Sequence, residues 1–160
     1  MKILGIDPGL VKTGFGLVEI IKEKKRVIDY GVIKPDAKAT LSKRLYTIYR
    51  DTKYIIEMHT PAVLSIEDIF YGKNVKSTIL LGQARGSVLI AAAEFDLSVY
   101  EYSPRKIKQS VTGNGNAHKE QIKYMVEKIL NVTLNKNELD ASDALAIALC
   151  YEQQFRVGDL

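Results

Sequence analysis

The sequence predicts an α/β domain in which helices cover a mixed β-sheet. Three segments with strand character come first, over about residues 2–7, 13–21 and 27–33, and their short turns are typical of an antiparallel meander. Helical and strand-like segments then alternate to the end of the chain, which favours a sheet with helices on its faces. A chain of 160 residues suits one core, so we expect a single domain over residues 1–160.

The later elements follow from hydrophobic periodicity and from glycine and proline. Between residues 41 and 59, seven residues recur at helical spacing and predict an amphipathic helix: Leu41, Leu45, Ile48, Thr52, Ile55, Ile56 and His59. The remaining segments are predicted in this order: a buried strand at 62–67, a helix at about 75–95, a strand at 97–101, a short helix from Pro104, a loop at 113–116, a helix containing Ile122 to Leu130, and a last helix at about 140–154.

The composition is that of an ordinary globular protein with a weak preference for anionic partners. Hydrophobic residues make up 46% and charged residues 26% of the chain, with a net charge of +4 and a pI near 9.0. The single cysteine, Cys150, excludes an internal disulfide, and its apolar neighbours indicate a core residue. The sequence has neither a signal-peptide pattern nor a stretch of membrane-spanning length, so we expect a cytoplasmic protein without membrane contact.

Four carboxylates stand where core-forming segments begin or end: Asp7, Glu67, Asp140 and Asp143. Asp7 and Glu67 each end a predicted strand, and open α/β sheets bind ligands at such strand ends. Asp140 and Asp143 are three residues apart, so they share a helix face. Each acid also has a structural explanation, as a turn residue, a solvated strand end or part of a helix N-terminus, and spacing alone does not decide. If the four converge, their repulsion calls for cations, and oxygen-only ligands suit magnesium or manganese.

Four short motifs occur in a characteristic order. They are Gly5-Ile6-Asp7-Pro8-Gly9 with Thr13-Gly14-Phe15-Gly16, then Ser65-Ile66-Glu67-Asp68-Ile69-Phe70 with Lys73-Asn74, then Leu81-Gly82-Gln83-Ala84-Arg85-Gly86, and last the segment from Asp140 to Ala148. Together these motifs resemble the RuvC family of Holliday-junction resolvases, in order and over nearly the whole chain. Each motif is short, but four in register are highly specific.

The resemblance implies a ribonuclease-H-like fold, with a five-stranded mixed sheet flanked by α-helices. It also implies that Asp7, Glu67, Asp140 and Asp143 are the catalytic acids and hold two Mg²⁺ ions, with Mn²⁺ as a substitute and no other cofactor. The implied activity is that of a crossover junction endodeoxyribonuclease, which resolves four-way DNA junctions by paired symmetric nicks in recombination and repair. Asp68 is not expected to be a ligand, because it should point to the opposite face from Glu67.

Two basic segments without acids are candidates for DNA contact. The first carries Lys73, Lys76 and Arg85, and the second carries Lys108 and Lys119, which match basic positions that the family uses near the scissile phosphate. A solvated helix face is the alternative for any such run of charge. Phe70 matches a family position implicated in base contact, with a hydrophobic plug under the loop as its alternative. For Tyr71 and His118 the sequence does not decide.

Expected partners follow from the symmetry of the substrate and from the resemblance. A four-way junction has two-fold symmetry, so two nicks call for a C2 homodimer. The 75–95 helix, with Gly82, Ala84 and Gly86, could pack on its copy or against its own sheet. Partnership with the RuvA–RuvB branch-migration complex is implied by the resemblance alone.

Three other classes of function compete with this interpretation. A related ribonuclease-H-like nuclease could act on other DNA or RNA, although the motif from Leu81 to Gly86 favours the junction enzyme. A non-catalytic junction-binding protein would not need the intact set of four acids. An actin-like ATPase is excluded because 160 residues cannot supply its two domains, and there is no Walker A pattern.

Overall fold

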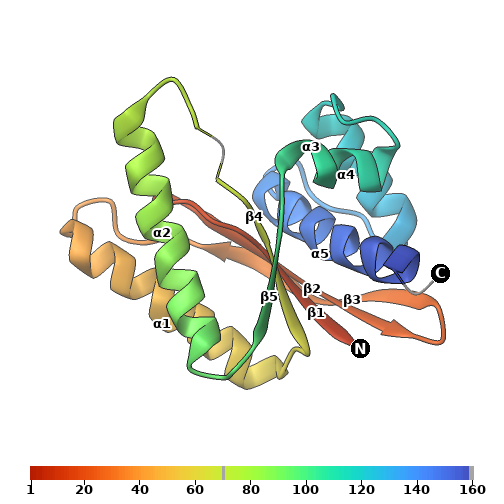
Figure 1. Cartoon of the computed structure of the whole chain (residues 1–160), viewed down its shortest axis with the longest axis horizontal. Coiled ribbons are helices and arrows are strands. Elements are labelled where there is room, and N and C mark those ends of the chain that lie inside the picture. Colours follow the sequence, from red (N-terminus) through yellow and green to blue (C-terminus); the bar gives the residue numbers. More distant parts are fainter. Residues whose placement is uncertain (70, 159–160) are drawn as a thin grey trace.

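The computed structural model describes residues 1–69 and 71–158, which form one five-stranded sheet between two layers of helices (Figure 1). The strand order is β3-β2-β1-β4-β5, with β1 antiparallel to β2 and parallel to β4. This confirms the predicted mixed sheet with a meander at one side. The strands are β1 Lys2–Asp7, β2 Thr13–Ile21, β3 Lys24–Ile33, β4 Val63–Glu67 and β5 Ser98–Tyr102.

The helices divide between the two faces of the sheet (Figure 1). On one face lie α1 Leu41–His59 and α2 Val75–Ala93; on the other lie α3 Pro104–Thr112, α4 Lys119–Leu130 and α5 Leu139–Gly158. Most predicted bounds agree with the structure within two residues, and two differ by more. Strand β3 begins at Lys24 because Lys22 and Glu23 make a tight turn with positive φ, and α5 continues beyond residue 154 to Gly158. Within the described residues, no helix is long and apolar enough to cross a membrane.

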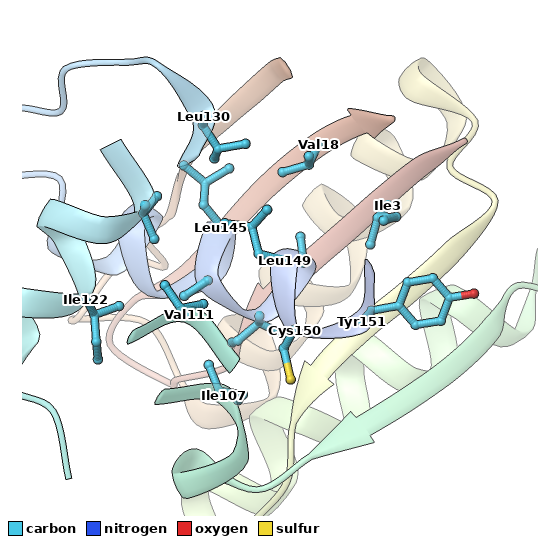
Figure 2. Packing of buried hydrophobic residues seen from close by; sticks show 14 of the residues in the cluster. Ile3, Val18, Ile107, Val111, Ile122, Leu130, Leu145, Leu149, Cys150 and Tyr151 are labelled. Atoms are coloured by element: carbon cyan, nitrogen blue, oxygen red, sulfur yellow. The ribbon is translucent and has the colours of Figure 1, made fainter. Parts of the chain in front are cut away.

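Alternation along the strands sends neighbouring side chains into two separate cores. Ile3 and Val18 pack with α3, α4 and α5, whereas Leu4 and Leu17 pack with α1 and α2. Figure 2 shows the first core, in which Leu145 and Leu149 of α5 lie over β1 and β2, beside Cys150. Cys150 is fully buried, which confirms its predicted place in the core. The sheet is therefore held firmly from both sides.

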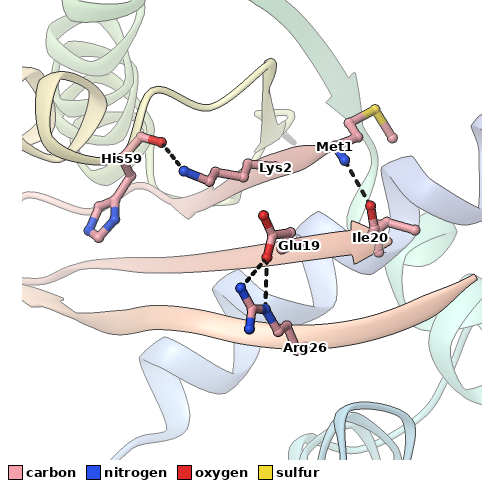
Figure 3. A network of polar contacts seen from close by, with 6 residues as sticks. All are labelled: Met1, Lys2, Glu19, Ile20, Arg26 and His59. Atoms are coloured by element: carbon pink, nitrogen blue, oxygen red, sulfur yellow. Dashed lines mark hydrogen bonds and ion pairs between the residues drawn. The ribbon is translucent and has the colours of Figure 1, made fainter. Parts of the chain in front are cut away.

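Polar contacts fasten the edge of the sheet where β1 begins (Figure 3). The Met1 amino group donates to the Ile20 carbonyl at 2.8 Å, and the Lys2 ammonium donates to the His59 carbonyl at 3.0 Å. The His59 ring also meets Asp29 at 2.9 Å, so its role is structural, at the end of α1. These contacts fix the start of β1 and leave its other end, at Asp7, open for chemistry.

A buried ion pair ties α5 to the β2–β3 hairpin. The side chain of Glu152 is 3% exposed and lies 2.7 Å from the Lys25 ammonium, and Arg156 of the next helical turn also contacts it. We expect Glu152→Ala to lower the free energy of unfolding by about 1–3 kcal/mol, because Lys25 then loses its 2.7 Å ionic contact at a largely buried site. Urea denaturation measures this.

The matched control is Glu23→Ala, which removes an 86% exposed carboxylate 3.8 Å from the same Arg156. We expect that change to stay within about 0.5 kcal/mol of the wild type, because exposed ion pairs contribute little. Equal losses for the two variants would contradict the importance of the buried pair.

Candidate active site

Asp7 and Glu67 lie side by side because the strands that carry them are neighbours. In the parallel pairing of β1 with β4, Ile6 aligns with Ile66, so the next residue of each strand is an acid at the same edge of the sheet. Both acids line a pocket on the face covered by α3, α4 and α5. The structure therefore brings these two predicted acids together in one pocket, while their role there stays a prediction.

Helix α5 brings the third acid. Asp143 lies in the first turns of α5 and lines the same pocket, a cavity of about 340 Å³. Its other walls come from the helices of this face: Pro104, Ile107, Lys108, Lys119, Ile122, Ala146 and Ile147. Asp140 stands one turn earlier on α5 and is not part of the wall, but its charge acts on Asp7 and Asp143. The structure thus gathers three of the four predicted acids in the pocket and places the fourth beside it.

Two predicted basic residues complete the pocket. The Lys119 ammonium lies 3.3 Å from an Asp143 carboxylate oxygen, and this charge raises the pKa of Lys119. Lys108 of α3 lines the pocket and acts electrostatically on Glu67 and Asp143. A pocket that presents carboxylates and ammonium groups together suits an anionic substrate bound with cations.

The carboxylates in the pocket disfavour one another's ionisation. Burial, followed by the charges of Glu67 and Asp143, raises the pKa of Asp7 to about 8. Burial is also the main cause of the raised pKa of Glu67 and of Asp143, and Lys119 partly offsets it in both. Without a cation, these carboxylates therefore resist being ionised together.

The donor set fits divalent magnesium or manganese, since the pocket offers carboxylate oxygens and neither histidine nor thiolate. In the described residues, no group of three or more such side chains is close enough to hold an ion in the conformation seen. Instead, Lys119 contacts Asp143 and Lys12 lies 3.9 Å from Asp140. Side-chain rotation away from these lysines would release the carboxylates for a cation.

The residues predicted to contact DNA differ in their exposure. Lys73, just before α2, and Lys76, in its first turn, are exposed and accessible to a phosphate backbone. Tyr71 is 92% exposed beside them. Phe70 lies outside the described residues, so its predicted base contact stays a prediction. His118 precedes α4, and its backbone amide donates to the Gln121 side chain at 2.9 Å, an arrangement typical of a helix N-terminus.

Arg85 does not join these residues on the surface. Its side chain is only 12% exposed, and its guanidinium lies 2.6 Å from Glu101 and 4.0 Å from Asp68. It also donates to the Glu67 carbonyl at 3.4 Å. Arg85 therefore braces the ends of β4 and β5 from α2, because the protein's own acids surround its charge. Asp68 directly follows β4, lies 4.0 Å from Arg85 and is not among the residues that line the pocket.

Sequence reasoning missed Lys12. It lies in the turn between β1 and β2, with its ammonium 3.9 Å from Asp140. The available signal was its place in the loop directly after Asp7, at the edge where strand-end acids gather. Lys12 and Lys119 thus flank the acid cluster from two different elements.

Fold and pocket together define a ribonuclease-H-like nuclease domain. The family model described as crossover junction endodeoxyribonuclease RuvC matches residues 3–151. A crossover junction endodeoxyribonuclease RuvC from Chloroherpeton thalassium is 47% identical over 94% of this chain and 81% of its own length. The chain belongs to the RuvC family of crossover junction endodeoxyribonucleases.

Solved structures agree with this assignment. Thermus thermophilus RuvC in complex with a Holliday junction substrate superposes with a TM-score of 0.91, at 31% identity over 99% of this chain and 96% of that one. The yeast mitochondrial Holliday junction resolvase Ydc2 shares the fold, with a TM-score of 0.69 at 13% identity over 98% of this chain and 82% of that one. The predicted ribonuclease-H-like fold is confirmed.

The raised pKa of Asp7 makes stability depend on pH. In the folded protein Asp7 keeps its proton up to a higher pH than in the unfolded chain, where its pKa is the ordinary 3.8. The contribution of this group to the free energy of unfolding is therefore complete below about pH 4. That stability is lost as the pH rises toward about 8. We expect Asp7→Asn, in chelator, to be more stable than the wild type at pH 8 by about 1–3 kcal/mol and nearly equal at pH 4.

Urea denaturation at the two pH values measures this difference. Asp51→Asn is the control, because Asp51 pairs with Arg50 on the exposed face of α1 and should leave the pH dependence unchanged. The same pH dependence in Asp7→Asn and in the wild type would show that Asp7 is not the group responsible.

Proposed function

We propose that this protein resolves four-way DNA junctions by paired symmetric nicks, through hydrolysis of phosphodiester bonds at the acid pocket. The observation that carries the proposal is the convergence of Asp7, Glu67 and Asp143 beside Lys108 and Lys119 in one pocket. Family membership and the likeness to a junction-bound relative support the choice of substrate. By family resemblance the products carry a 5′-phosphate and a 3′-hydroxyl, which allows ligation.

Asp7, Glu67, Asp140 and Asp143 would hold two divalent cations, Mg²⁺ first and Mn²⁺ as a substitute. When bound, such ions supply a water of lowered pKa and stabilise the leaving oxygen. The chain's own residues do the remaining work. Lys119 and Lys108 bring positive charge to the scissile phosphate, and Ile107 and Ile122 give the pocket an apolar wall that limits water.

The DNA path extends from the pocket along the loop that follows β4. Lys73, Lys76 and the exposed ring of Tyr71 lie on this side, with Phe70 between Tyr71 and Glu67 in the chain. Lysines there neutralise phosphates, while aromatic rings stack on unpaired bases at the crossover. Arg85 supports the start of this loop through Asp68 and the Glu67 carbonyl.

The function requires two active sites, and α2 offers the surface for a C2 homodimer. Ile79, Gly86 and Ile90 fall on one stripe of this helix, and Ile79 and Ile90 are 56% and 62% exposed. A side chain added at Gly86 would meet nothing within 4 Å, whereas Ala84 is buried in its own core. The proposed contact with a second copy thus rests on this stripe, not on Ala84, and the exposed Tyr46 of α1 lines a groove with Gly86 and Ile90 that extends it. Work with the RuvA–RuvB complex and a cytoplasmic location remain predictions.

The first test uses a labelled synthetic four-way junction and a linear duplex of the same sequence. We expect paired, symmetric, ligatable nicks in the junction alone, and only with Mg²⁺ or Mn²⁺. Asp7→Asn should bind the junction yet cut it at least about 100-fold more slowly, because it loses a cation ligand. Glu19→Gln, a change on β2 at the Arg26 ion pair, should cut at the wild-type rate.

Cleavage of both substrates would instead indicate a general ribonuclease-H-like nuclease. Tight binding without cutting under any metal would indicate a junction-binding protein. Near-normal turnover by Asp7→Asn would contradict the assignment of the acids.

The dimer is tested by matched substitutions. Ile90→Glu should weaken self-association at least about 10-fold, because it places a charge at the centre of an apolar interface. Val157→Glu is the control, since Val157 is equally exposed, at 62%, but lies at the far end of α5. Sedimentation equilibrium measures both. If Ile90→Glu remains as dimeric as the control, α2 is not the interface.

A further inference from the structure

Helix α5 packs on the backbone of β1 and β2 at glycines, and two of these glycines meet its backbone carbonyls. A Cβ atom built on Gly5 would lie 2.1 Å from the Ala144 carbonyl oxygen, and one built on Gly14 would lie 2.2 Å from the Asp140 carbonyl oxygen and 2.7 Å from its carbonyl carbon. These distances are far inside van der Waals contact, and the obstructing atoms are backbone. Any side chain at Gly14 therefore forces the first turn of α5 away from the sheet.

Gly14 occupies a special place in the sheet, because it is the residue of β2 that pairs with Asp7 of β1. It thus contacts one candidate cation ligand across the strand pair and supports the backbone of another, Asp140, on the helix above. A side chain at position 14 would therefore press on the backbone that carries Asp140, beside the backbone that carries Asp7.

A second contact fixes the same helix to β4. The fully buried Ser65 hydroxyl donates to the Ile147 carbonyl at 2.9 Å. Ser65 is two residues before Glu67 on the same strand face, and Ile147 is one turn after Asp143 on the same helix face. The hydrogen bond therefore ties the strand of one acid to the helix of another.

We propose that Gly14 is a positioning residue for the cation site, supported by Ser65: close seating of α5 on the sheet sets the spacing between the acids of the strands and those of the helix. The inference rests on the proposed metal-dependent function. Its chemical consequence concerns ion size. Mg²⁺ demands near-ideal geometry at about 2.0–2.1 Å, whereas Ca²⁺ accepts flexible geometry at about 2.3–2.6 Å. Close packing of α5 on the sheet favours Mg²⁺, and looser packing shifts the preference of the site toward Ca²⁺.

The test is the ratio of Mg²⁺ to Ca²⁺ affinity in Gly14→Ala, measured by isothermal titration. We expect Mg²⁺ affinity to fall at least 10-fold and Ca²⁺ affinity no more than 3-fold. General destabilisation would weaken both ions alike, so the ratio separates positioning from stability. A crystal structure of the metal-free variant should show a longer distance between Asp7 and Asp140.

Gly31→Ala is the matched control. It adds the same methyl group to a strand glycine, but the new atom would meet the Phe15 ring at 2.9 Å, without touching α5. We expect both affinities to stay at wild-type values in this variant. An unchanged ratio in Gly14→Ala, or an equal change in Gly31→Ala, would overturn the proposal.

Two further results keep the outcome clear. If Gly14→Ala does not fold, Ser65→Ala takes its place, because it removes the hydrogen bond to Ile147 without adding volume. We then expect a Mg²⁺ affinity at least 3-fold lower with Ca²⁺ affinity unchanged, and no change in either would overturn the proposal. A wild type that binds neither ion would instead contradict the proposed metal-dependent function. The distance between Asp7 and Asp140 in the crystal structure of the variant would still test whether Gly14 positions α5.

Discussion

Like charges crowded at one edge of the sheet are the constraint around which the rest of this structure is arranged. Asp7 and Glu67 end neighbouring parallel strands, and Asp143 faces them from the helix above. Burial and mutual repulsion raise the pKa of Asp7 to about 8, so the fold keeps a carboxylate where a lone charge is unfavourable. Such a site becomes favourable when cations share it, and metal-dependent nucleases use cations of this kind to hydrolyse phosphodiesters.

Lysines balance this cluster from outside the sheet. Lys119 contacts Asp143, and Lys12 approaches Asp140 from the turn after β1. These contacts are partly exposed, so each contributes little to stability and can be exchanged at small cost. When cations and DNA bind, each acid would exchange its lysine partner for a cation, and each lysine would exchange its acid partner for a phosphate. The same residues would then serve both the free protein and the complex with DNA.

The two faces of the sheet have different tasks. The face covered by α3, α4 and α5 contains the pocket, and its helix α5 sits on glycine backbone. The face covered by α1 and α2 leaves an apolar stripe on α2 exposed. Arg85 connects the two faces, because its backbone belongs to α2 and its side chain donates to the Glu67 carbonyl. The sequence suggested a DNA contact for Arg85 from its place in a basic segment. The ion pair that its largely buried guanidinium makes with Glu101 cannot be read from composition or spacing.

Local patterns alone predicted the order of strands and helices along the chain, the burial of Cys150 and the place of Asp7 and Glu67 at strand ends, because these follow from hydrophobic periodicity and from the direction of side chains along a strand. The pairing of β1 with β4 brought the two acids together, and the sheet divided the single expected core into two. Tertiary structure alone decided that Lys12 flanks Asp140, that Arg85 is internal, and that Asp140 stands outside the pocket wall. These facts depend on distances between elements far apart in the chain. Such distances are set by packing, here the contact of α5 with Gly5 and Gly14, which no local period encodes.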